Sequence, residues 1–216
     1  MSVWQYLSAQ LSAVYDQYGR TNEANRSPKS VGLITMRERD FVQAESQPFR
    51  DLEAMLEGRV FHVTKRQHME AIICSGALLP NADGHLETTF GSSANSFFRL
   101  NGCVSVFDYR NHEVAGIAEY RRRCYPFQAA RPGGAGIAIL MLKPESYQEL
   151  LPWTEWSISG DLSQNIVPYV EAGYPGPLPL SMIDEVLFVR ITEDPGCLAA
   201  LVRRSYFSIL LTSFSR

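Results

Sequence analysis

Three segments of the sequence carry side chains whose types could do chemistry. The first is Val60-Phe61-His62-Val63-Thr64, in which a histidine lies between apolar neighbours in a short β-rich run. An imidazole can both donate and accept hydrogen bonds, so His62 at a strand edge could hold a ribose or a phosphate of a ligand. The alternative is a core histidine whose ring is satisfied by a backbone group. Both interpretations place His62 on a strand.

The second segment runs from Cys103 to Tyr109 and alternates like a strand. Alternation puts Cys103, Ser105 and Phe107 on one face. Ser105 could then offer a hydroxyl group to a cleft, and Tyr109 a flat ring on which a planar heterocycle stacks. The alternative is an ordinary strand with a polar end.

The third segment surrounds Glu171, which lies between apolar residues and a turn dense in glycine and proline. A carboxylate that is buried there needs a partner or a function. Glu171 is therefore either a carboxylate aimed into a cleft or one that caps a turn at the surface.

The elements that position these segments follow from hydrophobic spacing. Val3 to Tyr18 shows the spacing of an amphipathic helix, and Asp40 to Leu56 shows it again. We therefore expect residues 1–57 to form a mainly helical N-terminal section, which could cap the main domain, shield its site or hold a partner.

Residues 58–216 are predicted to form one domain of mixed helices and strands. Strands and helices do not alternate strictly, and neither GxGxxG nor GxxxxGK[ST] is present, so a doubly wound parallel sheet is not expected. The class is α+β with a split, mostly antiparallel sheet. Residues 152–180 lack a sustained period and are predicted to be a long irregular loop. The other expected elements are strands at Arg59–Val63, Ala135–Leu142 and Asp184–Ile191, helices at Gln67–Ser75 and Glu113–Arg123, a final helix from Asp194, and a closing strand within Tyr206–Phe214.

Composition and charge narrow the function classes. The chain of 216 residues is 45% hydrophobic and 20% charged, as in ordinary soluble globular proteins. A net charge of -3 argues against a general nucleic-acid binder, although Arg121-Arg122-Arg123 could supply a local basic groove. The four cysteines have no zinc-site spacing, so no metal is predicted. With neither a signal-like N-terminus nor an apolar run of about 20 residues, we expect a cytoplasmic protein without a membrane segment.

The order of the motifs resembles the ADP-ribosyltransferase superfamily. A strand with His-x-Thr is followed by a helix, by Ser-Gly-x-Leu, by a strand with a serine and by a late glutamate. The chain is most similar to bacterial toxin branches with a histidine on the first strand, including the DNA-targeting ADP-ribosyltransferase toxins. The resemblance spans Arg59 to Ile191 and is clearest at FHVTKRQHMEAIICSGAL and VPYVEAGYPGPLPLSMIDEVLFV. It implies a split β-sandwich of that type.

The resemblance also implies an activity, the cleavage of the bond between nicotinamide and ribose in NAD. The transition state resembles an oxocarbenium ion, and a fixed carboxylate stabilises the positive charge that develops. This is the catalytic role that the resemblance gives to Glu171. The cofactor-binding residues that it implies are His62 and Thr64 on the adenosine side, Gly76 in the turn after the helix, and Ser105 and Tyr109 around the nicotinamide.

The acceptor of ADP-ribose is implied less directly. The residue two before the catalytic glutamate is glutamine or glutamate in many relatives, whereas here it is Tyr169. This departure disfavours an arginine target and suits a nucleic-acid base, a hydroxyl group or another side chain. The acceptor would be DNA, RNA or protein, and an antitoxin or inhibitor could be a further partner of a toxin or phage-defence effector. The implied acceptor-recognition residues are Trp153, Glu155, Trp156 and Tyr169.

Several alternatives stay open. Glu155 and Glu185 are alternative catalytic carboxylates, and Ser105 stands where another branch of the superfamily has a tyrosine. An RNA 2′-phosphotransferase-like enzyme would need basic residues for a 2′-phosphate, but His68, His85 and His112 fit no such pattern. A non-catalytic module that binds NAD or nucleic acid would keep the cleft without needing Glu171.

Overall fold

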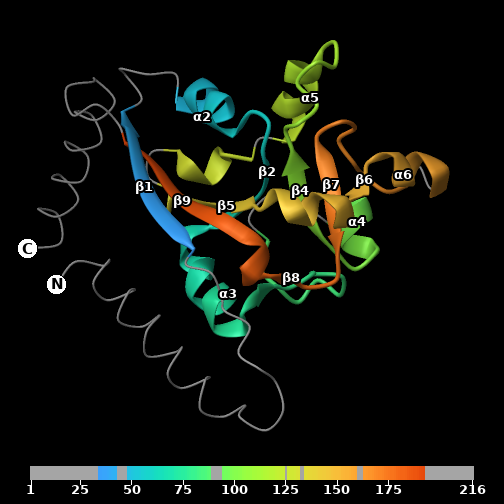
Figure 1. The fold of residues 1–216 in the computed structure, drawn as a ribbon, viewed down its shortest axis with the longest axis horizontal. Helices are drawn as coiled ribbons and strands as arrows, with labels where there is room; N and C mark the ends of the chain where they lie inside the picture. The colour runs from blue at the N-terminus through green and yellow to red at the C-terminus, as the bar shows by residue number, and fades with distance from the viewer. Residues whose placement is uncertain are drawn as a thin grey trace, which may run out of the picture.

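A computed structural model describes residues 34–42, 48–88, 94–124, 126–131, 134–159 and 163–192 (Figure 1). The helix expected at Val3–Tyr18 and the elements expected after Asp194 lie outside these residues. None of the described helices is both long and apolar enough to cross a membrane.

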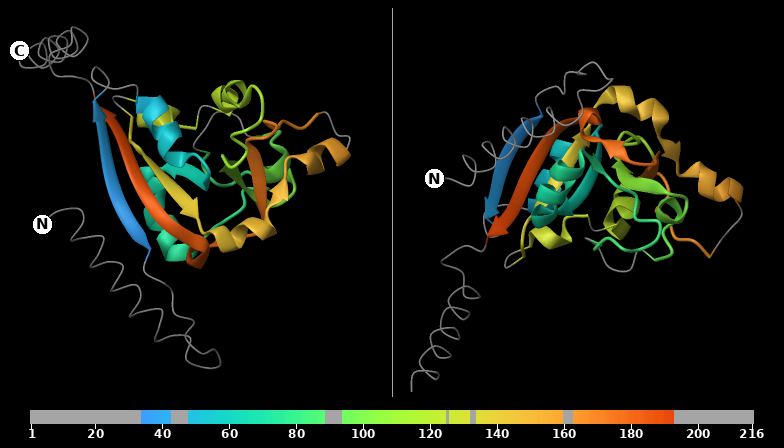
Figure 2. Two further views of the ribbon diagram at one scale, coloured as in Figure 1. Left: turned by 45° about the horizontal axis from the view of Figure 1, so that its top comes forward. Right: turned by 90° about the horizontal axis from the view of Figure 1, so that it is seen from below.

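A seven-stranded sheet organises the described part of the chain, in the order β1-β9-β5-β2-β4-β7-β6. Every neighbouring pair is antiparallel except β1 and β9, which run parallel, side by side at one edge (Figure 2). The α+β class with a mostly antiparallel sheet is therefore confirmed. The strands are β1 (Thr35–Val42), β2 (Val60–Lys65), β4 (Cys103–Asp108), β5 (Ile137–Leu142), β6 (Leu151–Pro152), β7 (Glu171–Pro175) and β9 (Ile183–Thr192), and a separate pair is formed by β3 (Ala77–Leu78) and β8 (Leu178–Pro179).

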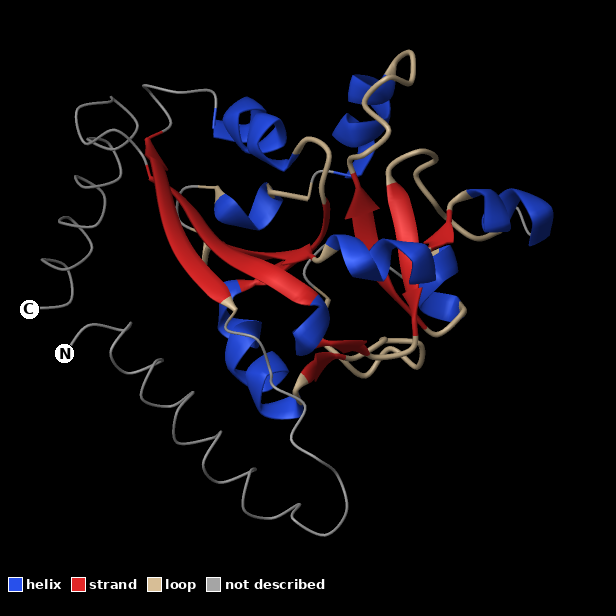
Figure 3. Ribbon diagram, viewed as in Figure 1, coloured by secondary structure: helices blue, strands red, loops and turns tan. Residues whose placement is uncertain are grey.

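The sheet opens between β2 and β4. β2 pairs with β5 along five residues, but it pairs with β4 only at Val60↔Asp108 and Phe61↔Phe107. Figure 3 shows β4, β7 and β6 as a group set apart from β1, β9 and β5. Beyond Phe61 the strand β2 separates from β4, so the residues from His62 to Lys65 have no backbone pairing with β4.

Helices and 3₁₀ turns cover the sheet and connect its strands. The Gln67–Ser75 helix is confirmed in part, since a 3₁₀ turn leads into α3, which ends at Gly76 in the left-handed conformation (φ 71°). The helices are α2 (Pro48–Leu56), α3 (Met69–Ser75), α4 (Phe97–Leu100), α5 (Ile117–Cys124) and α6 (Thr154–Ser159), and the 3₁₀ turns are η1 (Arg66–His68), η2 (Gln128–Ala130), η3 (Pro144–Glu149) and η4 (Leu180–Met182).

The core lies on both faces of the sheet. Every residue of β5 is buried, and alternate residues join different apolar clusters. Ile139 packs with Phe61 and Leu52 on one face, whereas Leu140 packs with Leu78 on the other. The strand expected at Ala135–Leu142 is thus confirmed from Ile137 onward.

Two predictions of local structure were wrong. Asp40 to Leu56 was expected to be helical throughout, but β1 extends to Val42 and the helix begins only at Pro48. Ion pairs such as Arg37–Glu185 attach the charged strand β1 to β9, so tertiary pairing outweighs the helical spacing. The section 1–57 therefore contains a strand of the main sheet.

The second error concerns residues 152–180, which were expected to be irregular. They contain α6, β7 and β8. Glycine and proline weaken the strand signal of β7, but the strand buries Ala172, Gly173 and Tyr174 against β4 and the core. Glu171 consequently lies at the start of a strand rather than in a loop.

Candidate functional site

A cavity of about 750 Å³ is lined by residues at the opening between β2 and β4. Its lining includes His62 and Thr64 from β2, Ser105 from β4 and Glu171 from β7. Because β2, β4 and β7 are consecutive in the sheet, the split brings three distant segments of sequence to one cavity. Four of the six predicted catalytic and cofactor-binding residues therefore meet.

His62 is oriented by the neighbouring strand. Its Nδ1 lies 2.8 Å from the carbonyl oxygen of Ser105, which can only accept, so Nδ1–H is the donor and Nε2 of the neutral ring carries a lone pair. Burial lowers the pKa of His62 from its ordinary value, while the Ser105 carbonyl acts in the opposite direction. The ring is thus a neutral, fixed imidazole in the cavity wall.

Glu171 is held by the turn that precedes β7. Its Oε2 accepts a hydrogen bond of 2.7 Å from the backbone amide of Val167. Burial raises the pKa of the Glu171 carboxyl, and the Val167 amide partly opposes this rise. Burial also raises the pKa of the nearby Cys124 thiol, with a further contribution from the charge of Glu171. The cavity therefore contains a carboxylate with one oxygen fixed by the backbone.

Thr64 and Gly76 occupy different positions relative to the cavity. Thr64 lines it with only 4% of its surface exposed, and its Oγ1 lies 3.0 Å from Nδ1 of His68. Gly76 is not among the lining residues, although Ser75 and Ala77 on either side are. Its carbonyl accepts a hydrogen bond from Leu180 N–H, so Gly76 shapes the wall rather than facing a ligand.

The prediction that Tyr109 stacks on a ligand is wrong. Its side chain is 1% exposed and packs edge-on against Phe61. The guanidinium of Arg121 covers the ring, with its carbon 4.3 Å from the ring centre. Tyr109 lies in the same core cluster as Phe107, two residues earlier, so strand alternation holds but leads its ring into the core rather than to the cavity.

None of the four predicted acceptor-recognition residues is in the lining of the cavity. Trp153 and Tyr169 contact each other with ring centres 4.6 Å apart, and Glu155 is exposed on α6. Trp156 donates from Nε1 to the carbonyl of Gln164 and packs on a small apolar cluster. The rings of Trp153 and Tyr169 meet, and the backbone amide of Trp156 donates to the Trp153 carbonyl over 3.1 Å, so these residues lie near one another but outside the cavity lining.

The alternative carboxylate Glu185 is engaged elsewhere. It lies on β9, two strands from β2, and forms an ion pair of 3.1 Å with Arg37 of the edge strand β1. Its side chain is 16% exposed and is not in the cavity lining, unlike Glu171.

Two arginines also line the cavity: Arg99, which the sequence did not single out, and Arg123, which belongs to the run predicted as a local basic groove. Both arginines are cationic, and the guanidinium of Arg123 also lies over the ring of Tyr120, 5.3 Å from its centre. Arg99 Nε donates to the carbonyl of Asn81 over 2.6 Å. Of the Arg121–Arg123 run, only Arg123 is in the lining, because Arg121 is buried and Arg122 pairs with Glu119 on the surface.

A second polar group in the lining is centred on Glu87. Glu87 accepts hydrogen bonds from Lys65 and from Nε2 of His68, the latter over 3.2 Å. Lys65 and then His68 lower the pKa of the Glu87 carboxyl. These contacts attach the segment 79–88, which forms one wall of the cavity, to β2 and η1. In the sequence, the only signal for the contacts of Glu87 is that His68 lies six residues after His62.

Gly173 sets the spacing between β7 and α4. A Cβ atom at this position would overlap the ring of Phe98, which packs directly on the strand backbone. Two residues from Glu171, this close approach fixes where β7 lies. Among the described residues, no three His, Cys, Asp or Glu side chains gather as a metal site.

Comparison with known proteins gives no family for this chain. No family model, curated protein or solved structure matches it. What the site can do must therefore be argued from its own residues.

Proposed function

We propose that the protein is a mono-ADP-ribosyltransferase whose cavity binds NAD and whose Glu171 catalyses cleavage of the nicotinamide–ribose bond. One observation carries this proposal. His62, Ser105 and Glu171 come from three consecutive strands and line one cavity of about 750 Å³, which is large enough for a dinucleotide-sized ligand.

The bond-breaking step suits the environment of Glu171. The C–N bond leaves its electron pair on nicotinamide, which departs neutral, and positive charge develops on the ribose. A carboxylate with one oxygen fixed by Val167 N–H can stabilise that charge and accept from a ribose hydroxyl through its other oxygen. Because burial raises the pKa of Glu171, its carboxyl group ionises at a higher pH than usual. Turnover should therefore rise with pH as this group loses its proton.

The remaining lining suits the rest of NAD. The lone pair on Nε2 of neutral His62 can accept a hydrogen bond from a ribose hydroxyl group. Arg99 and Arg123 supply charge complementary to the pyrophosphate. The acceptor nucleophile then bonds to the ribose carbon and loses its proton to solvent. Macromolecular acceptors, and a role as a toxin or phage-defence effector, are parts of the proposal that rest on the resemblance alone.

The test is a transfer assay with NAD labelled in the adenosine part, with DNA, RNA or cell protein as acceptor. We expect label to enter one of these fractions and nicotinamide to be released. Glu171→Gln should lower nicotinamide release about 10²–10³-fold, the usual cost of losing one charge-stabilising group. Glu155→Gln is the matched control, because Glu155 is an exposed carboxylate outside the cavity lining, and it should retain activity.

Three outcomes would contradict the proposal. Nicotinamide release that survives Glu171→Gln would reject the catalytic role of Glu171. Binding of NAD without turnover would indicate a non-catalytic module. Loss of a labelled 2′-phosphate from RNA, with the phosphate recovered on NAD or on water and no ADP-ribose transferred to a macromolecule, would indicate phosphotransferase chemistry instead.

A further inference from the structure

Tyr169 has a backbone conformation that its residue type disfavours. Its φ is 64°, and it is the one non-glycine residue with positive φ in the part of the chain that the structure describes. A Cβ atom makes the left-handed region costly for such residues. Strained residues of this kind persist where their surroundings hold them, and they concentrate at functional sites.

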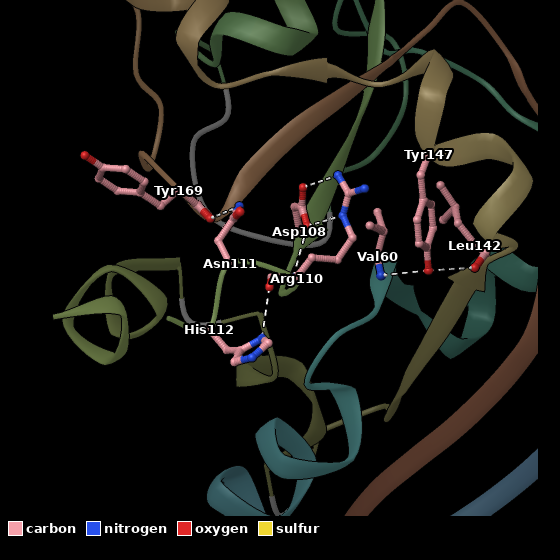
Figure 4. Close-up of polar contacts among 8 residues, drawn as sticks. All are labelled: Val60, Asp108, Arg110, Asn111, His112, Leu142, Tyr147 and Tyr169. Atoms are coloured by element: carbon pink, nitrogen blue, oxygen red, sulfur yellow. Dashed lines mark hydrogen bonds and ion pairs between the residues drawn. The ribbon is translucent and has the colours of Figure 1, made fainter. Parts of the chain in front are cut away.

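Contacts from three elements hold Tyr169 in place. The side-chain amide of Asn111, in the turn after β4, donates to the Tyr169 carbonyl over 3.2 Å (Figure 4). The Tyr169 ring contacts Tyr120 of α5 at 5.1 Å between ring centres and Trp153 before α6 at 4.6 Å. In Figure 4 the ring points away from the Asp108–Arg110 pair, and its hydroxyl lies at the far end.

The turn that contains Tyr169 also fixes the carboxylate of Glu171. The amides of Val170 and Glu171 both donate to the carbonyl of Val167, over 3.3 and 3.1 Å. The amide of Val167 in turn donates to Oε2 of Glu171 over 2.7 Å. The carbonyl of Val170 accepts a hydrogen bond of 2.6 Å from the backbone amide of Asp108. This bond joins the turn to β4. A left-handed residue between Val167 and Glu171 is what lets the chain close this turn.

We infer that Tyr169 is a positioning residue, whose clamped left-handed turn aims the Glu171 carboxylate into the cavity. This inference rests on the proposed function of Glu171 and differs from the sequence prediction that Tyr169 recognises the acceptor. Tyr169 is not in the cavity lining, whereas Val167 and Glu171 are. The ring of Tyr169 therefore acts on the carboxylate of Glu171 only through the backbone of the turn.

The first measurement needs no NAD. Hydrogen exchange of the Val167 amide in the full, unliganded chain reports whether the turn holds the Glu171 carboxylate, because that amide donates to Glu171 Oε2. Tyr169→Ala should speed this exchange about tenfold by releasing the turn, while Tyr169→Phe, which keeps the ring, should match the wild type. Asn111→Ala should shift exchange in the same direction by a smaller factor. Ile158→Ala is the control, because that side chain on α6 is 75% exposed, and it should leave exchange unchanged.

The second measurement is NAD cleavage with water as the only acceptor. A positioning residue lowers kcat with little change in KM, so Tyr169→Ala should lose about tenfold in kcat and Tyr169→Phe should restore it. Unchanged Val167 exchange in Tyr169→Ala, or a loss confined to transfer onto a macromolecule, would overturn the inference. If the wild type cleaves no NAD, the proposed function fails, and the exchange result still decides whether Tyr169 closes the turn.

Discussion

The imidazole of His62 on β2 donates from Nδ1 to the carbonyl of Ser105 on β4, 2.8 Å away and 43 residues later in the sequence. This bond bridges the two strands just beyond the point where their ladder ends at Phe61↔Phe107. The backbone of one side of the split thus determines which ring nitrogen of His62 faces a ligand.

We expect His62→Ala to weaken NAD binding while leaving the fold intact. The variant removes one hydrogen-bonding group from a cavity wall, which corresponds to about a tenfold loss of affinity. Calorimetric titration with NAD measures the loss, and thermal unfolding followed by circular dichroism checks the fold. A variant that binds as the wild type does, or that fails to fold, would show that His62 is a structural histidine.

Protonation of His62 should also affect stability. Its folded-state pKa is lowered by burial, so between that value and the ordinary 6.5 the unfolded chain binds a proton that the folded chain does not. The stabilising contribution of neutral His62 is therefore complete above pH 6.5 and is lost as pH falls through the lowered pKa. Urea unfolding of wild type and His62→Gln should show a difference that changes across this window, and a pH-independent difference would contradict it.

Glu171→Gln should stabilise the protein at neutral pH. Burial raises the pKa of Glu171 above 4.5, so the folded chain binds its proton more tightly, and wild-type stability falls as pH rises through the raised pKa. The glutamine carbonyl can keep the Val167 hydrogen bond without the buried charge. Each unit of pKa shift corresponds to about 1.4 kcal/mol.

Unfolding free energies of the two proteins, measured from pH 4 to pH 8, test this prediction. The advantage of Glu171→Gln should disappear toward pH 4.5, where both side chains are neutral. A variant that is less stable than wild type at pH 8 would mean that a positive partner compensates the carboxylate.

Gly173→Ala should destabilise the protein by about 1–3 kcal/mol, the usual cost of overpacking. The new methyl group would overlap the ring of Phe98, which lies on the backbone of β7. The double variant with Phe98→Leu removes part of that ring and should recover some of the loss. A double-mutant cycle of unfolding free energies measures the coupling, and additive effects would show that α4 does not constrain β7.

At Tyr169, glycine should be more stable than alanine by about 1 kcal/mol, because glycine adopts a left-handed conformation without steric cost. Both variants lose the ring contacts with Tyr120 and Trp153, so the comparison isolates the backbone. Thermal unfolding of the pair measures the difference. Equal stability would mean that the turn relaxes once the ring is removed.

The sequence predicted which residues come together better than it predicted the elements that carry them. The β-rich run at His62 and the alternation through Ser105 are local signals, and both residues lie on strands as predicted. Glu171 was predicted as a site residue, but it was placed in a loop. Gly173 and Pro175 have low strand propensity, and β7 is stabilised by its pairing with β4 rather than by a local pattern.

Other parts of the site depend on contacts that no local pattern encodes. Tyr109 continues the alternation of β4, yet its ring packs in the core with Phe107 and is covered by Arg121 of α5. Arg99 reaches the cavity from the short helix α4, whose position depends on Phe98 packing on β7. Strand β1 has an alternating charge pattern whose partners, such as Glu185, are remote in sequence.

The pairing of β1 with β9 has a consequence for the biosynthesis of the protein. β9 lies between β1 and β5, and the contact of Asp40 with Arg190 joins positions 150 residues apart. During translation β1 is the first of the seven strands to be synthesised, but it has no strand partner until β9 has been made. Until then the edge of β5 that pairs with β9 is also unpaired. Long-range pairing of this kind is slow, so a nascent chain that already contains His62, Ser105 and Glu171 still lacks the strand that completes the sheet. Translation thus delays completion of the sheet until β9, the last of its seven strands, has been synthesised.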